Sequence, residues 1–135
     1  LEIHEKTQSS VLGVFSASEN QVSNYGVISS KNIDGVEKVD GIVEKPKPAD
    51  APSNLAVFGR YILSKDIFLN IEQTKPGLNN EIQLTDAIQD LISNEDVFAL
   101  EFEGRRFDCG SKEGYISAII DRASSIDKFK SIIEK

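Results

Sequence analysis

The chain of 135 residues has no tryptophan and no methionine, and it has only one histidine and one cysteine. The single cysteine, Cys109, cannot form a disulfide within the chain, which favours a reducing, cytoplasmic setting. One cysteine and one histidine also cannot supply the four ligands of a structural zinc site. No apolar run approaches the roughly 18 residues that a membrane-spanning helix needs. The composition therefore predicts a cytoplasmic protein that does not span a membrane.

Positive charge is also scarce. The 15 lysine and arginine residues stand against 22 aspartate and glutamate residues, which gives a net charge of −7, and no segment is dominated by basic residues. Non-specific binding to nucleic acid depends on clustered positive charge, so we expect no nucleic-acid partner. Because 39% of the residues are hydrophobic, the chain has enough apolar material for one small globular core. The absence of methionine and the leucine at position 1 lead us to expect a piece of a longer protein.

Strands are predicted mainly in the first half of the chain. A turn at Asn32–Gly35, with glycine where φ is positive, indicates a hairpin. A second turn is expected at Asp40–Gly41, and Gly59 is expected either to interrupt a strand or to let another segment approach it closely. Glu103–Gly104 is predicted to turn the chain into a return segment at 105–108. The predicted strands are 11–17, 25–29, 36–39, 41–45, 55–63 and 97–102.

Helices are predicted mainly in the second half, so the fold class is mixed α/β. Ser64 and Ser111 are each expected to cap a helix, and Asn80 with Gln83 resembles a capping box. A last helix presents its apolar side chains on one face, which predicts packing on the body of the protein or a contact between subunits. Those side chains are Ile126, Phe129, Ile132 and Ile133.

The most informative motif is Val-Glu-Lys-Pro-Lys-Pro at residues 43–48. Neighbouring side chains of a strand point to opposite faces, so Glu44 and Lys45 cannot both face one core. The prolines that follow end the strand, and strand ends are where α/β sheets usually bind ligands. A carboxylate accepts hydrogen bonds from hydroxyls, and a lysine is a point charge for phosphate. The pair therefore suits a sugar phosphate.

Three further positions are candidates for chemistry. Asp108 precedes a predicted helix, where it is either an oxygen ligand for Mg²⁺ or a residue that caps the helix or pairs with a neighbouring arginine. Gly26 begins a strand, where the missing side chain either lets a ligand approach the backbone or serves a turn. Cys109 has no partner base, so we expect a small buried hydrophobic residue rather than a nucleophile.

Six segments, in order along the chain, together resemble the bacterial UTP–glucose-1-phosphate uridylyltransferases, also called UDP-glucose pyrophosphorylases. The resemblance runs through nearly the whole chain. The family's Gly-rich nucleotide-binding loop and its first metal-binding aspartate have no counterpart here. The segments are 25–28, 43–48, 51–56, 59–61, 80–88 and 101–110.

The resemblance implies a Rossmann-like nucleotidyltransferase domain, in which a mixed sheet is flanked by helices. Residues 1–135 would be the C-terminal part of that single domain, with the sugar-phosphate side and the late helices, and would lack the nucleotide-binding half. The complete enzyme would transfer UMP from UTP to glucose 1-phosphate, giving UDP-glucose and pyrophosphate. It would be a homo-oligomer, and the 135-residue chain alone would lack turnover.

The resemblance also implies roles for four residues. Glu44 would bind glucose hydroxyls, and Lys45 would be the catalytic residue that binds the phosphate of the sugar. Gly26 would lie against the sugar or the uridine, and Asp108 would be one of two aspartates that hold Mg²⁺. Two alternatives are a related nucleotidyltransferase that uses dTTP and a non-catalytic fragment that binds sugar phosphate or oligomerises.

Overall fold

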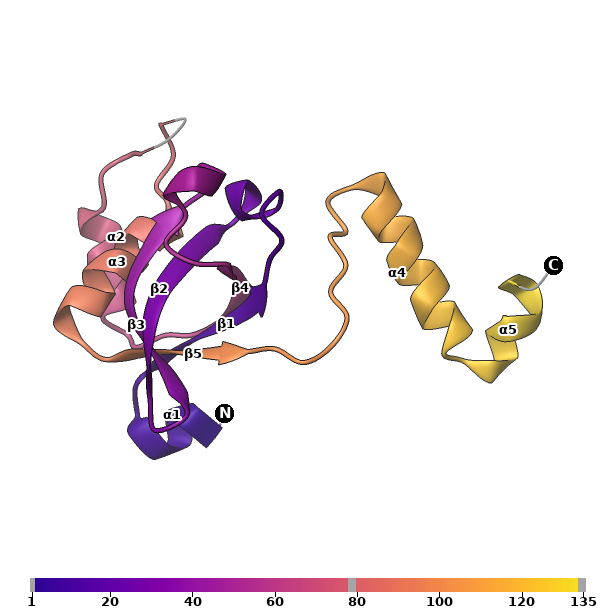
Figure 1. The fold of residues 1–135 in the computed structure, drawn as a ribbon, viewed down its shortest axis with the longest axis horizontal. Coiled ribbons are helices and arrows are strands. Elements are labelled where there is room, and N and C mark those ends of the chain that lie inside the picture. The colour runs from indigo at the N-terminus through magenta and orange to yellow at the C-terminus, as the bar shows by residue number, and fades with distance from the viewer. Residues whose placement is uncertain (1, 78–79, 134–135) are drawn as a thin grey trace. The chain divides into compact units, whose positions relative to one another are not determined.

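The computed structural model describes residues 2–77 and 80–133, and the chain divides into two compact units (Figure 1). The first unit is Leu1–Phe102 and the second is Glu103–Lys135. Every buried apolar side chain among the described residues belongs to the first unit. Among the described residues, the hydrophobic core therefore lies in the first unit.

The first unit is built on five strands that close into a ring in the order β1-β4-β2-β3-β5. β1 and β5 are parallel, and the other neighbouring strands are antiparallel, so the predicted mixed sheet is confirmed. The largest core cluster joins branched apolar residues of the strands, such as Leu12, Val14 and Ile28, with apolar residues of the helices. The strands are β1 (Ser10–Ser16), β2 (Gly26–Ile33), β3 (Val36–Glu44), β4 (Leu55–Ile62) and β5 (Val97–Glu101).

The hairpin of β2 and β3 forms as predicted, but it is longer than expected. Asp34 and Gly35 both have positive φ, 52° and 84°, as a tight hairpin turn requires. The turn predicted at Asp40–Gly41 is wrong, because β3 continues through it. Ser29 pairs with Gly41 and Ser30 with Val39, which leaves Asp40 as the extra residue of a β-bulge. The bulge bends β3 while keeping it in the sheet, so one long strand reaches Glu44.

β4 continues through Gly59, but its pairing with β1 is interrupted around this residue. Gly59 has φ of 76°, and the pairing with β1 shifts between Leu12, which faces Tyr61, and Val14, which faces Val57. Between these two pairs, residues 58–60 of β4 stand opposite Gly13 alone, so β4 carries two extra residues there. A shift of two residues leaves Val57 and Tyr61 on the same face of the strand.

Three helices belong to the first unit, and two of them form a layer beside the strands (Figure 1). α3 packs on β3, and α2 packs on α3. Gln89 of α3 accepts a hydrogen bond from the Ile42 backbone N–H at 2.8 Å, which ties the helix to the strand just after the bulge. The helices are α1 (Glu2–Thr7), α2 (Ile67–Gln73) and α3 (Leu84–Asn94), with 3₁₀ turns η1 (Val22–Asn24) and η2 (Pro48–Asp50).

The predicted caps of α2 and α3 are wrong. Asp66 stands at the N-cap of α2 and Gln83 at that of α3, and neither side chain makes a capping hydrogen bond. Ser64 lies too far upstream, and Asn80 is three residues ahead of the cap position. Tertiary packing of the apolar face therefore sets where these two helices begin, rather than a capping side chain.

The second unit contains α4 (Lys112–Ser124) and α5 (Asp127–Ile133). Ser111 caps α4 as predicted, because its Oγ accepts a hydrogen bond from Gly114 N–H at 3.0 Å. The return segment predicted at 105–108 forms no strand with β5, since that described segment is irregular. On α5, Phe129 and Ile132 are exposed, and the side chain of Ile133 lies outside the described part. Of the described helices, none has the length and apolar character that a membrane span requires.

Candidate functional site

Glu44 and Lys45 come together at the end of β3 because the backbone leaves the strand at Lys45. Lys45 has φ of 44°, in the left-handed region that non-glycine residues rarely adopt. The Lys45 Nζ lies 3.5 Å from the Glu44 Oε1, so neighbouring side chains that a regular strand would separate are paired. The left-handed backbone at Lys45 thus explains how two adjacent side chains come together although neighbouring side chains of a regular strand point to opposite faces.

The conformation of Lys45 is imposed by its surroundings. A residue that precedes proline prefers extended backbone, yet Lys45 departs from this preference just before Pro46, which is buried. The Lys45 N–H donates to the Tyr25 carbonyl at 3.0 Å and so prolongs the β2–β3 ladder by one bond. A backbone held in a sparsely populated region is a frequent feature of ligand sites.

Gly26 lies directly across the ladder from Glu44. It is buried, and a Cβ built on it would lie 2.8 Å from Thr85 Cγ2, 3.1 Å from Val57 Cγ2 and 3.4 Å from Glu44 Oε2. The glycine is therefore needed for close packing beside the Glu44 carboxylate. The structure places Gly26, Glu44 and Lys45 together and adds Thr85 of α3 as their neighbour.

Two polar residues of this cluster had no assigned role in the sequence analysis, Tyr61 and Thr85. Burial, and then the negative charge of Glu44, raise the pKa of the Tyr61 hydroxyl above its ordinary value. Tyr61 is protonated at neutral pH, and the charge of Glu44 acts on it through the field rather than through a hydrogen bond given by the structure. The Thr85 hydroxyl is buried and has no hydrogen-bond partner among the described residues. A buried hydroxyl without a hydrogen bond destabilises the fold, so Thr85 stands out among the residues around Glu44.

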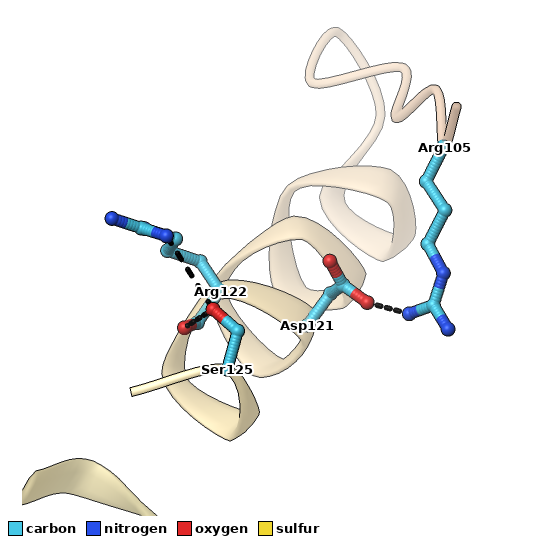
Figure 2. Close-up of polar contacts among 4 residues, drawn as sticks. All are labelled: Arg105, Asp121, Arg122 and Ser125. Atoms are coloured by element: carbon cyan, nitrogen blue, oxygen red, sulfur yellow. Dashed lines mark hydrogen bonds and ion pairs between the residues drawn. The ribbon is translucent and has the colours of Figure 1, made fainter. Parts of the chain in front are cut away.

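Asp108 lies in the second unit, three residues ahead of the Ser111 cap. Its side chain is exposed, and its Oδ1 accepts a hydrogen bond from the Gly110 backbone N–H at 3.0 Å. Its carbonyl accepts from the Ser111 hydroxyl at 3.1 Å. The ion pair of Arg105 is with Asp121 rather than Asp108 (Figure 2). Asp108 is thus a carboxylate oriented by its own turn.

The residue following Asp108 corrects one expectation. Cys109 is exposed, not the small buried hydrophobic residue that the sequence suggested. The segment around it has no apolar layer over it in this chain, because no buried apolar residue lies in the second unit among the described residues.

A magnesium ion is compatible with Asp108. The described residues hold no group of three or more side chains that could bind a metal by themselves. Mg²⁺ usually binds through one or two carboxylates together with substrate phosphates, rather than in an all-protein cage. A single exposed, oriented aspartate therefore matches the donor set that this ion takes.

The fold and the placement of these residues define the class of protein. The profile of the nucleotidyl transferase family matches residues 1–125, and the chain belongs to this family. The expected nucleotidyltransferase fold, with a mixed sheet and helices, is confirmed.

Particular relatives narrow the class further. The chain is 45% identical over 122 residues to UTP–glucose-1-phosphate uridylyltransferase 2 of Streptococcus pyogenes serotype M3, with 89% of this chain covered. It is 46% identical over 125 residues to a UTP–glucose-1-phosphate uridylyltransferase of Streptococcus pyogenes, with 91% covered. The chain spans 41% of the length of these curated relatives. The resemblance inferred from the sequence is confirmed.

Solved structures agree. A UDP-glucose pyrophosphorylase complexed with UDP-glucose superposes with a TM-score of 0.87 at 44% identity, covering 93% of this chain and 48% of that chain. A UTP-bound UGPase from Acinetobacter baumannii gives a TM-score of 0.81 at 35% identity, covering 99% and 48%. A glucose-1-phosphate thymidylyltransferase from Bacillus anthracis, at 23% identity and a TM-score of 0.66, shares the fold.

Proposed function

We propose that this chain is the sugar-phosphate side of a UTP–glucose-1-phosphate uridylyltransferase. The complete enzyme transfers UMP from UTP to glucose 1-phosphate and releases pyrophosphate. The observation that carries the proposal is the pairing of Glu44 with Lys45, 3.5 Å apart, on a backbone turn that ordinary strand geometry does not produce. The identity of 45% to the streptococcal uridylyltransferase supports the choice of substrates.

The chemistry assigns different work to the two side chains. Glu44, with 19% of its side chain exposed, accepts hydrogen bonds from hydroxyls of the glucose. Lys45, with 46% exposed, is free to turn its ammonium group from Glu44 toward the sugar phosphate. Lys45 then neutralises part of the phosphate charge while the sugar-phosphate oxygen attacks the α-phosphorus of UTP. Positioning and charge neutralisation account for most catalysis of phosphoryl transfer.

The remaining roles follow from the environment of each residue. Gly26 leaves room for Glu44 and Thr85 around it, and the charge of Glu44 raises the pKa of the Tyr61 hydroxyl. Asp108 is proposed as one of the ligands of Mg²⁺. When bound, this ion supplies charge neutralisation for the transferring group.

The test uses a chimera in which these 135 residues replace the matching segment of the Streptococcus pyogenes enzyme. The chimera is expected to form UDP-glucose and pyrophosphate from UTP and glucose 1-phosphate, with less activity toward dTTP. Lys45→Ala should lower kcat/KM by at least about 10²-fold, the usual effect of removing a group that stabilises transition-state charge. Lys47→Ala is the matched control, since Lys47 is exposed in the same segment. A folded chimera without turnover, or a Lys45→Ala variant as active as the parent, would contradict the proposal.

A homo-oligomer and a cytoplasmic location remain part of the proposal. The support for the oligomer is the exposed apolar surface of α4, whose side chains Tyr115, Ile116, Ile119 and Ile120 are 48% to 56% exposed. Exposed apolar patches of this kind usually mark sites where a protein contacts another molecule. Light scattering on the chimera measures the subunit number, and a monomer at all concentrations would rule out this part.

A further inference from the structure

We propose that Gly114 is a positioning residue that holds Asp108 at the start of α4, an inference that rests on the metal-binding role proposed for Asp108. Neither the sequence patterns nor the proposed reaction assigns any role to Gly114. The inference concerns the second unit alone, and all of its contacts lie within residues 105–125.

Asp108 is held by hydrogen bonds to both its side chain and its backbone. The Gly110 N–H donates to Asp108 Oδ1 at 3.0 Å, and the Ser111 N–H and hydroxyl donate to the Asp108 carbonyl at 3.2 and 3.1 Å. The Ser111 Oγ in turn accepts from the Gly114 N–H at 3.0 Å. The carboxylate is thus linked to the first turn of α4 through a short chain of bonds.

The turn formed by residues 108–111 contacts α4 directly at Gly114. A Cβ at position 114 would overlap the Asp108 carbonyl oxygen, and it would lie 2.8 Å from the Asp108 carbonyl carbon and from Ser111 Oγ. The overlapped group is backbone, which cannot rotate away as the end of a flexible side chain would. A side chain at 114 therefore has to displace Asp108 or unwind the first turn.

The backbone conformation of Gly114 does not by itself require glycine. Its φ lies outside the left-handed range, and the residue is in a regular helix. Glycine is a poor helix former, and alanine is the best. A glycine at this half-buried helical position is therefore unfavourable for the helix alone, and the contact with Asp108 supplies the physical reason for it.

A second contact fixes the segment that leads to Asp108. Arg105 forms an ion pair with Asp121 in the second half of α4, and Figure 2 shows the guanidinium group reaching this carboxylate. In the last turn of α4, Arg122 and Ser125 bond to each other through side chain and backbone. Asp108 is consequently anchored to α4 from both directions, through Arg105 before it and through Ser111 after it.

The test is ¹H–¹⁵N NMR of the 135-residue chain, with Gly114→Ala compared with Ser117→Ala, an exposed α4 position one turn further on. In Gly114→Ala, the Gly110 amide should lose its hydrogen-bonded chemical shift and its protection from exchange. Ser117→Ala should leave both unchanged. The amides of the first unit report in the same spectrum that the chain is folded.

A Gly110 amide in Gly114→Ala that keeps its parent chemical shift and protection would overturn the positioning role. If α4 also became more protected in that variant, better helix propensity alone would explain the result. If Gly114→Ala melts α4, Asp121→Asn is the second variant, because it releases Arg105 without crowding the helix. Asp121→Asn should shift the Gly110 amide resonance in the same direction as Gly114→Ala does, but by less. An unchanged Gly110 resonance in Asp121→Asn would count against the inference.

Mn²⁺, used as a paramagnetic probe, separates this inference from the proposed function. In the parent chain, Mn²⁺ should broaden the amides of residues 108–111 before those near other exposed carboxylates. The apparent Mn²⁺ affinity should fall at least about tenfold in Gly114→Ala, as for other residues that orient metal ligands. Equal broadening in both chains would overturn the inference. Absence of broadening in the parent chain would contradict the metal role of Asp108. The chemical shift and protection of the Gly110 amide would still test the positioning role of Gly114.

Discussion

Helices α3 and α4 are similar in length and differ in what holds them. α3 buries Thr85, Ala87, Ile88 and Leu91 against the strands, whereas α4 buries no residue among those described. α3 has no capping side chain, and α4 has a capping serine and the Arg105–Asp121 ion pair. Tertiary burial therefore stabilises one helix and local polar contacts the other. The residues proposed to bind the sugar phosphate belong to the unit that has a core, and Asp108 belongs to the unit held by local bonds.

The largest expected effect on stability comes from a residue of the core, which among the described residues lies in the first unit. Leu12 is fully buried, and Leu12→Ala should lower the free energy of unfolding by about 2–5 kcal/mol. Ile119 is 50% exposed on α4, and Ile119→Ala should change it by less than about 0.5 kcal/mol. Urea unfolding followed by circular dichroism measures both, and equal effects would contradict the comparison.

The next effect concerns the crowding at Gly26. Gly26→Ala should destabilise the first unit by about 1–3 kcal/mol, because the new methyl group meets Thr85 Cγ2 at 2.8 Å. Thr85→Ser removes that methyl and keeps the hydroxyl. The double variant should therefore be more stable than the sum of the two single effects predicts. Strict additivity in a double-mutant cycle would show that Thr85 is not the residue that excludes a side chain at position 26.

A smaller effect tests the left-handed backbone of Lys45. Glycine adopts positive φ without the steric penalty of other residues, so Lys45→Gly should be more stable than Lys45→Ala by about 1 kcal/mol. Both variants remove the ammonium group and should lose sugar-phosphate binding equally. Urea unfolding of the pair gives the difference, and a more stable alanine variant would argue against the left-handed turn.

The smallest effect is a pH dependence confined to the first unit. Because the pKa of Tyr61 is raised on folding, the folded state keeps its proton at pH values where the unfolded state has lost it. The free energy of unfolding should therefore fall as the pH rises above about 10, the ordinary tyrosine value, and Tyr61→Phe should weaken that fall. Glu44→Gln should lower the pKa of Tyr61, as seen by NMR of ¹³C-labelled tyrosine. An unchanged pKa in Glu44→Gln would show that the carboxylate does not act on Tyr61.

Local signals predicted much of this fold. The hairpin turn at Asp34–Gly35 and the interruption at Gly59 were found because glycine marks positive φ. The cap of α4 was found because Ser111 supplies its own hydrogen bond to the helix. Asp40–Gly41 was misjudged as a turn because an Asp–Gly pair suits a turn and a bulge alike, and only pairing with Ser29 and Ser30 distinguishes them.

The site itself was only partly predictable, since two of its features depend on distant partners. The positive φ of Lys45 opposes the local preference of a residue before proline, and it accompanies a hydrogen bond to Tyr25. The effect of Glu44 on the pKa of Tyr61 joins residues of two different strands, β3 and β4, which are far apart in the sequence. Motif reading could find Glu44 and Lys45 but could not show how adjacent residues come to act together.

The most direct measurement is a titration of the 135-residue chain with glucose 1-phosphate, followed by ¹H–¹⁵N NMR. We expect saturable shifts centred on Gly26, Glu44, Lys45 and Tyr61, weak shifts with glucose alone, and loss of the response in Lys45→Ala. The Lys47→Ala control should respond like the parent chain. Shifts of equal size in Lys45→Ala, or none in the parent chain, would contradict the assignment of this pair to the sugar phosphate.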